Sequence, residues 1–447
     1  MPAPRPRGRQ PIEAPARARP GPRLRAPAAG RFATRGQPAA VAAVERMLRH
    51  GAPQALLLVG PASVGKTTLA LDLAAGILCH ADDPDLRPCG SCRSCRLIDA
   101  GAHQDLHRLA PEGPGLQVRI GDHEDPDPGT VRHLLRELAR LPVEGAHRVA
   151  IVEAAHRLNE DAQNALLKTL EEPPAGATLI LCADEPERLL PTVRSRVAVL
   201  RLGPVGVRVM EGVLAEHGVE PPRSAQLARL ADGRPGLAIT LAAAPEAVAA
   251  REELARSLLD LAALGTADRL VAGRDLLARA ADLARIGGTP AVSPGPGSGA
   301  VVAGSTVAGS TVAGSTGDPE AEAGPRPARG TPAERRQAAA SLIATWTAVA
   351  RDLAVTAAGA GAAVRDTALL DDLRAVAAAV APGACSAFLG RLVRAAELLD
   401  ANANPELLVD TLVLAWPRAH AHAGTGASAR PRATGPFGGR QPAGDPR

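Results

Sequence analysis

Residues 55–68 read ALLLVGPASVGKTT, and this stretch decides the fold. Its leading apolar residues predict a buried strand, and the residues that follow fit the pattern G-x-x-x-x-G-K-[ST] at 60–67. In such loops, glycines let backbone N–H groups point at phosphate oxygens, the lysine reaches the outer phosphates, and the threonine hydroxyl can ligate magnesium. The alternative interpretation is an ordinary glycine-rich turn between a strand and a helix. The residues that we expect to bind nucleotide here are Gly60, Gly65, Lys66, Thr67 and Thr68.

The sequence around this stretch favours an α/β fold. From residue 36 to about residue 203, helical periods alternate with short apolar runs, which is the pattern of a parallel sheet covered by helices. The predicted strands are residues 55–59, 149–152, 178–182 and 197–200.

Beyond the predicted sheet, the chain is expected to be helical. Its 447 residues are enough for two or three domains. Residues 204–245 have the pattern of a small helical unit. Residues 246–285 and 336–418 have the pattern of amphipathic helices rich in Leu and Ala.

Three segments are too biased in composition to form a packed core. The stretch 286–335 contains VAGST three times in tandem and is expected to be a flexible insert. Residues 1–35 and 419–447 are rich in Arg, Pro and Gly and are expected to be disordered tails. The first tail could bind phosphates without sequence preference, or it could be a solvated linker.

Composition limits the classes of function. Residues 1–36 carry nine Arg against Glu13, so the formal charge of +4 becomes about −4 without them. With three Phe, two Trp and no Tyr, the chain lacks the aromatic residues of a base-stacking surface. No uninterrupted apolar stretch approaches the ~18 residues that span a bilayer. We therefore expect a soluble, cytoplasmic protein.

Four of the six cysteines lie within residues 79–95 in the pattern C-x9-C-x2-C-x2-C. The last three can surround one turn, and the intervening loop is long enough to bring the first one back. Four thiolates in tetrahedral array suit zinc in a closed, structural site. Redox chemistry and free buried thiols are the alternatives. The predicted ligands are Cys79, Cys89, Cys92 and Cys95.

The end of the strand predicted at 149–152 is where a nucleotide hydrolase places two acids, one that holds magnesium and one that activates water. Here Glu153 stands at the first position and Ala154 at the second. A glutamate can still reach a metal ion, but alanine cannot polarise water, so we expect weak or absent turnover. Glu160 and Asp161 are the alternative acids, although at the start of the next predicted helix they suit capping and the helix dipole.

In order and spacing, four motifs resemble the bacterial DNA polymerase III clamp loaders, a branch of the AAA+ ATPases. They are the phosphate loop, the cysteine insert, NALLKTLEEPP at 164–174 and LLPTVRSRV at 189–197. The resemblance covers residues 36–245 and resumes at LLDANANPELLVDTLVLAW, residues 398–416. It implies a P-loop domain over 36–203, a helical lid and an all-α collar domain that the VAGST insert would interrupt.

The resemblance also implies roles for single residues. Arg196 matches the arginine finger that such loaders donate across a subunit boundary into a neighbour's ATP site. The alternative is a surface arginine that closes a strand connection. Gly236 stands where a lid arginine would be expected, with Arg234 two residues earlier. This departure again suggests a subunit without its own hydrolytic cycle.

Together these features favour a non-motor stator subunit with structural zinc, and with ATP and magnesium as further cofactors. The partners that the resemblance implies are gamma/tau and delta subunits in a pentameric ring, with the sliding clamp and primed DNA reached through the complex. The alternative is a gamma/tau-type ATPase motor. An unrelated P-loop kinase or transferase would leave the cysteine insert and NALLKTLEEPP unexplained.

Overall fold

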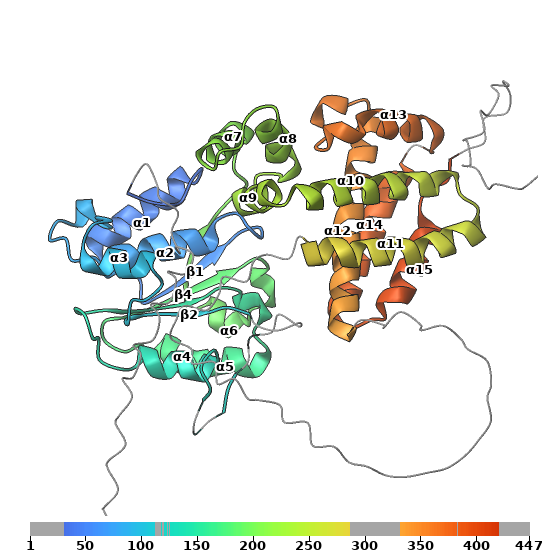
Figure 1. Cartoon of the computed structure of the whole chain (residues 1–447). Helices are drawn as coiled ribbons and strands as arrows, with labels where there is room; N and C mark the ends of the chain where they lie inside the picture. Colours follow the sequence, from blue (N-terminus) through green and yellow to red (C-terminus); the bar gives the residue numbers. More distant parts are fainter. Residues whose placement is uncertain are drawn as a thin grey trace, which may run out of the picture.

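The computed structural model describes residues 31–111, 118, 120–122, 124, 126–286, 331–381 and 383–419. Its centre is a parallel sheet with the strand order β2-β3-β4-β1-β5 (Figure 1). The strands are β1 (Ala55–Val59), β2 (Leu106–Leu109), β3 (Arg148–Val152), β4 (Ala177–Ala183) and β5 (Ala198–Arg201). The predicted strands are confirmed to within a residue at each end. β2 was not predicted, because LHRL is short and half polar.

Helices cover both faces of this sheet (Figure 1). Leu56 and Leu58 of β1 pack into the cluster under α1 and α2, whereas Leu57 and Val59 pack into the cluster under α4 and α5. Because β1 is buried on both faces, it reads as a continuous apolar run. The helices of this part are α1 (Pro38–His50), α2 (Lys66–Ile77), α3 (Arg93–Asp99), α4 (Val131–Leu138), α5 (Glu160–Glu171) and α6 (Pro191–Arg194).

Part of the predicted N-terminal tail is packed rather than disordered. Phe32 is buried, and the buried Asp72 of α2 accepts hydrogen bonds from the backbone N–H groups of Ala33 and Thr34 and from the Thr34 hydroxyl, at 2.7–2.9 Å. These contacts correct the expectation for residues 31–35. The remaining tail residues, 1–30, lie outside the described part of the chain.

A small helical unit follows the sheet, as the pattern of 204–245 predicts. It has its own apolar cluster around Met210, Leu214 and Leu227. Its helices, which we call the lid, are α7 (Val207–Glu216), α8 (Arg223–Leu230) and α9 (Pro235–Ala243).

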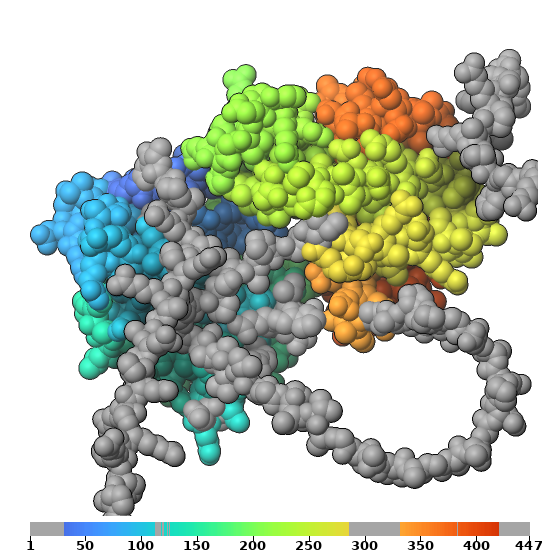
Figure 2. All heavy atoms as spheres, viewed as in Figure 1, coloured from blue at the N-terminus to red at the C-terminus, as the bar shows by residue number. Residues whose placement is uncertain are grey.

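The C-terminal part is all helical and has a separate core. Trp346, Phe388 and Trp416 meet at its centre, with ring centroids 4.9–5.6 Å apart. Figure 2 shows that its surface adjoins that of the lid on the viewed face. We call these helices the collar: α10 (Pro245–Asp260), α11 (Thr266–Ile286), α12 (Pro332–Ala357), α13 (Leu370–Ala379), α14 (Ala384–Asp400) and α15 (Pro405–Ala415).

The collar's longest helix bears on two expectations. α12 begins at Pro332 behind a capping box of Thr331 and Glu334, so its first turn lies inside the predicted insert 286–335. Residues 287–330 and the predicted tail from residue 420 onward lie outside the described residues. α12 is also long and apolar enough by composition to cross a membrane, which a search for uninterrupted apolar runs misses. Its buried residues, among them Leu342 and Leu353, pack in the collar core, as in the central helix of a helical domain.

Candidate nucleotide and metal sites

The phosphate loop has the backbone geometry that its sequence predicts. Gly65 has φ 110°, a left-handed conformation that favours glycine, and it directly precedes the first turn of α2. Lys66 is buried, and its Nζ donates to the carbonyl oxygens of Gly60 at 2.8 Å and Pro61 at 2.7 Å. Thr67 and Thr68 follow in the same turn. The predicted loop residues therefore surround the N-terminus of α2, which favours anions.

A carboxylate already faces the lysine of this loop. Asp184 follows β4, the strand beside β1, and its Oδ1 lies 2.6 Å from Lys66 Nζ. His156 supports the acid from the other side: its Nδ1 accepts from the Asp184 N–H at 3.2 Å, and its Nε2 lies 3.9 Å from Oδ2. Burial lowers the pKa of His156, while the Asp184 charge opposes that shift. The sequence analysis missed Asp184, although its position after a predicted strand was a usable signal.

Glu153, the acid predicted to reach the metal, is held by an arginine instead. Arg108 of β2 donates from Nε to Glu153 Oε1 at 2.9 Å, and its Nη2 contacts the same oxygen. The two side chains are 19% and 17% exposed, so this ion pair is mostly withdrawn from water. Arg108 was missed because β2 was missed.

The second acid position holds no polar group. Ala154 is 8% exposed and lies at the position expected for the residue that activates water. Cys182 of β4 is fully buried beside Thr67. Burial and the Glu153 charge raise its pKa to about 12, with Lys66 and a hydrogen bond from Thr67 opposing the shift. The pocket thus contains a neutral thiol where it faces the loop threonine.

The lid touches the phosphate loop directly. The Gly236 N–H donates to the carbonyl oxygen of Ser63 at 3.0 Å. A Cβ at position 236 would lie 3.2 Å from Ser63, so this contact leaves little room for a side chain. Arg234 donates to the carbonyl oxygen of Ala231 at 3.0 Å, and burial lowers its pKa. Within the described part of the chain, neither Gly236 nor Arg234 makes a hydrogen bond or ion pair with Lys66 or Asp184.

Arg196 lies apart from these groups, on the surface after α6. Its side chain is 37% exposed, and its Nη2 lies 2.7 Å from Oε1 of Glu171, the last residue of α5. Its Nη1 donates to the Thr192 carbonyl oxygen at 3.1 Å and to Ser195 Oγ at 3.2 Å. These contacts fix the direction of an exposed guanidinium.

The four predicted cysteine ligands come together. Their Sγ atoms all lie within 4.8 Å of one another. Backbone N–H groups donate to three of the sulfurs, as expected for thiolates in a metal site: Ala81 and Cys89 to Cys79, Cys92 to Cys89, and Cys95 to Cys92, at 3.3–3.5 Å. Four converging sulfurs with N–H donors fit zinc, and no ligand position is left for a catalytic water.

Burial and hydrogen bonding act on these thiols in opposite directions. Burial raises the pKa of Cys79 and of Cys95. Burial also acts on Cys89, but N–H donors around its sulfur lower its pKa to about 6. The site follows the end of α2, whose 12 residues separate it from the phosphate loop by about 18 Å. This distance fits a structural site better than a catalytic one.

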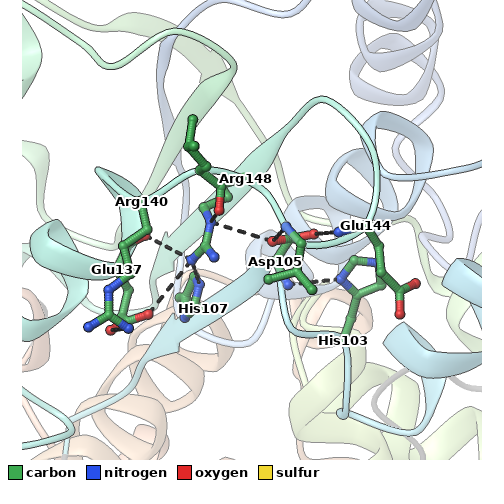
Figure 3. Close-up of polar contacts among 9 residues, drawn as sticks. His103, Asp105, His107, Glu137, Arg140, Glu144 and Arg148 are labelled. Atoms are coloured by element: carbon green, nitrogen blue, oxygen red, sulfur yellow. Dashed lines mark hydrogen bonds and ion pairs between the residues drawn. The ribbon is translucent and has the colours of Figure 1, made fainter.

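A buried polar network joins the segment of residues 79–99, which we call the cysteine module, to the sheet. Figure 3 shows the part of this network around Asp105. Ser94, between two of the cysteines, shares a hydrogen bond of 2.9 Å with His103 Nε2. The fully buried Asp105 accepts from the N–H groups of Val143 and Glu144 at 2.8 and 2.7 Å. Arg148, the first residue of β3, approaches Asp105 to 3.4 Å. The sequence analysis did not identify this network.

Comparison with known proteins places these sites in a family context. Residues 36–206 match the family model described as DNA polymerase III, delta subunit. The chain is 39% identical over 147 residues to DNA polymerase III subunit delta' of Pseudomonas aeruginosa, covering 32% of this chain and 40% of that protein. It is 38% identical over 189 residues to subunit delta' of Escherichia coli, covering 42% and 54%. It is 36% identical over 165 residues to subunit gamma/tau of Mycobacterium bovis, covering 36% and 26%.

The matches cover only part of each delta' relative. The aligned part spans about half the length of the curated delta' relatives or less. A DNA polymerase III gamma subunit-related protein from Thermotoga maritima covers 83% of this chain and 97% of its own, at 16% identity and a TM-score of 0.31, a likeness too low to support an argument. The aligned regions confirm the resemblance to DNA polymerase III clamp-loader subunits.

Proposed function

We propose, from the resemblance of residues 36–206 to DNA polymerase III subunit delta', that this chain is a stator of the bacterial clamp loader. It occupies a pentameric ring with gamma/tau and delta subunits in the cytoplasm and helps ATP-driven loading of the sliding clamp onto primed DNA. It hydrolyses little or no ATP itself. It supplies Arg196 to a neighbouring ATP site. The observation that carries this proposal is the state of the acid positions, with Glu153 held by Arg108 and Ala154 beside it.

The missing acid accounts for the lack of turnover. Attack on a γ-phosphate needs a residue that orients or deprotonates water, and a positioned general base contributes about 10²–10⁴ in rate. Ala154 cannot do this. The nearby acids are engaged, Glu153 by Arg108 and Asp184 by Lys66. The site has the groups that bind phosphate, Lys66 and the N-terminus of α2, but among the described residues it lacks a side chain that could activate water.

Arg196 has the features of a group that acts outside its own chain. It is exposed, and Glu171 and the Thr192 carbonyl oxygen fix its direction. A guanidinium near developing phosphate charge can contribute about 10³–10⁵ to kcat. Its exposed pair with Glu171 is weak enough to exchange for a phosphate contact.

Zinc would be held by Cys79, Cys89, Cys92 and Cys95. When bound, it cross-links the end of α2 to α3 and keeps the thiols ionised. The cysteine module then contributes to stability, and the polar network around Asp105 connects it to the sheet.

Steady-state ATP hydrolysis tests this proposal. We expect the purified chain alone to give near-background activity. Added to motor subunits, DNA and sliding clamp, it should stimulate hydrolysis, and Arg196→Ala should remove the stimulation. Arg194→Ala is a matched control, because Arg194 is also exposed and ends α6, the helix that precedes Arg196. Equal stimulation by the Arg196 variant would contradict the role in trans.

The second candidate is a gamma/tau-type motor. The complete phosphate loop favours it, as does the 32% identity over 220 residues to subunit tau of Escherichia coli. Substantial turnover by the chain alone, abolished by Lys66→Ala, would support the motor and overturn the stator.

A further inference from the structure

We infer that this phosphate loop takes its nucleotide without a divalent cation, because Arg108 occupies the carboxylate that would hold the metal. The inference rests on the proposed binding of nucleotide. The family resemblance implies magnesium, but the side chains at the expected metal position do not fit it.

The ligand set for magnesium is incomplete. Mg²⁺ demands near-octahedral oxygen coordination and in P-loop enzymes uses the loop hydroxyl together with an acid from a neighbouring strand. Thr67 provides the hydroxyl, but it lies beside the Cys182 thiol, a poor magnesium ligand. Glu153 would have to provide the acid.

Glu153 cannot leave Arg108 without a penalty. The Arg108 guanidinium donates two hydrogen bonds to Oε1 of Glu153, one of them at 2.9 Å. Among the residues that the structure describes, Arg108 has no other hydrogen-bonding or ion-pair partner. A metal on Glu153 would therefore leave a mostly buried guanidinium unpaired and close to a second cation, which is strongly unfavourable.

Asp184 is the remaining acid near the loop. Its Oδ1 contacts Lys66 at 2.6 Å, and His156 flanks its other oxygen. A phosphate that reaches Lys66 would displace this carboxylate, so Asp184 is the one rival ligand that the test must include. Without a metal, the charge that attracts phosphate comes from Lys66 and the N-terminus of α2.

The test is equilibrium binding of a fluorescent ATP analogue to the full-length chain, with and without magnesium. Magnesium is omitted from a metal-depleted buffer rather than chelated, so that the cysteine module keeps its metal. We expect the dissociation constants to agree within about threefold, whereas a metal-dependent site would differ by about tenfold or more.

Three variants test whether the Arg108–Glu153 pair is the reason that binding does not depend on magnesium. Arg108→Gln frees Glu153, so magnesium should tighten ATP binding to this variant by about tenfold. Arg96→Gln is the control, because Arg96 is an exposed arginine of α3, and nucleotide binding by this variant should remain independent of magnesium. Glu153→Gln should also stay metal-independent, which keeps the test decisive if Arg108→Gln does not fold. Equal binding by Arg108→Gln in both buffers would overturn the role of Arg108.

Other outcomes overturn the inference in distinguishable ways. Magnesium-dependent binding by the unchanged chain would refute it and leave nucleotide binding intact. If Asp184→Asn then abolished that dependence, Asp184 would be the metal ligand. No binding in either buffer would refute both this inference and the proposed nucleotide site. Stimulation through Arg196 is measured separately and would survive any of these results.

Discussion

In the proposed nucleotide site, Lys66 is the cation that a phosphate would reach, and its ammonium group already has an anionic partner. The Asp184 carboxylate lies 2.6 Å away and is about one-third exposed. A phosphate must displace this acid and then remain beside its negative charge. The Asp184 carboxylate would therefore compete with the nucleotide phosphate for Lys66.

Removing this competition should strengthen binding. We expect Asp184→Asn to raise the affinity for ATP by about tenfold, or ~1.4 kcal/mol, since charged hydrogen bonds of this kind contribute about that much. Titration with a fluorescent nucleotide measures it. Glu185→Gln is the matched control, because Glu185 is adjacent but pairs with Arg188. Unchanged or weaker binding by Asp184→Asn would show that the carboxylate does not compete.

Residues of the site differed in how well the sequence predicted them. Gly60, Gly65 and Lys66 form a local pattern whose geometry follows from the glycines and the strand-to-helix turn. The partners Arg108 and Asp184 come from other strands, and their contacts depend on which strands are neighbours. Local periodicity does not reveal the order of the strands. The pairing of Glu153 with Arg108 and of Asp184 with Lys66 could therefore be found only in the structure.

At the scale of elements, the cysteine module and the polar network around Asp105 form one support for the N-terminal ends of β2 and β3. Ser94 of α3 shares a hydrogen bond with His103. Asp105 accepts hydrogen bonds from two N–H groups of the loop at 143–144 (Figure 3). Two separate changes test this support.

The first change removes a metal ligand. Cys92→Ser should abolish stoichiometric zinc and increase amide hydrogen exchange over residues 79–99, because the site cannot close with three thiolates. Cys385→Ser, in the collar core, should keep its zinc. Zinc analysis and hydrogen exchange on the same samples decide it. A Cys92 variant that keeps both metal and protection would exclude the four-thiolate site.

The second change removes a buried charge. Asp105→Asn keeps the shape, but it removes the closer of the two carboxylates beside Arg148, leaving Glu137 at 3.7 Å, and it gives two N–H groups a weaker acceptor. We expect a loss of about 3 kcal/mol in the free energy of unfolding, measured in urea. Asp371→Asn, at an exposed position in α13, should change it by less than about 0.5 kcal/mol. A similar stability for the two variants would mean that the network is not a support.

The predicted elements show where sequence patterns suffice. Buried strands gave clear apolar runs, so β1, β3, β4 and β5 were predicted to within a residue at each end, and the start of α5 was expected at Glu160. The sequence did not predict β2, because two of its four residues, His107 and Arg108, are polar and make side-chain contacts with Arg148 and Glu153. The start of α12 was predicted too late, because the Thr331 cap and Pro332 resemble in composition the biased stretch before them.

At the scale of the whole molecule, ion pairs connect the sheet, the lid and the collar. Arg365 of the collar lies 2.7 Å from Asp232 of the lid, four residues before the Gly236 that contacts the phosphate loop. Arg188, four residues after Asp184, pairs with Asp400 at the end of α14. Both connections are exposed and therefore weak singly. In the proposed stator, the two pairs together would limit the movement of the three parts.

The structure of the assembled ring with a bound ATP analogue is the most direct measurement of the stator assignment. We expect the Arg196 guanidinium to have exchanged Glu171 for a phosphate oxygen of the neighbouring subunit, at about 3 Å. In the same ring, Glu153 should remain on Arg108. An Arg196 side chain turned away from every adjoining triphosphate, or a metal ion bound to Glu153 beside a nucleotide, would contradict the assignment.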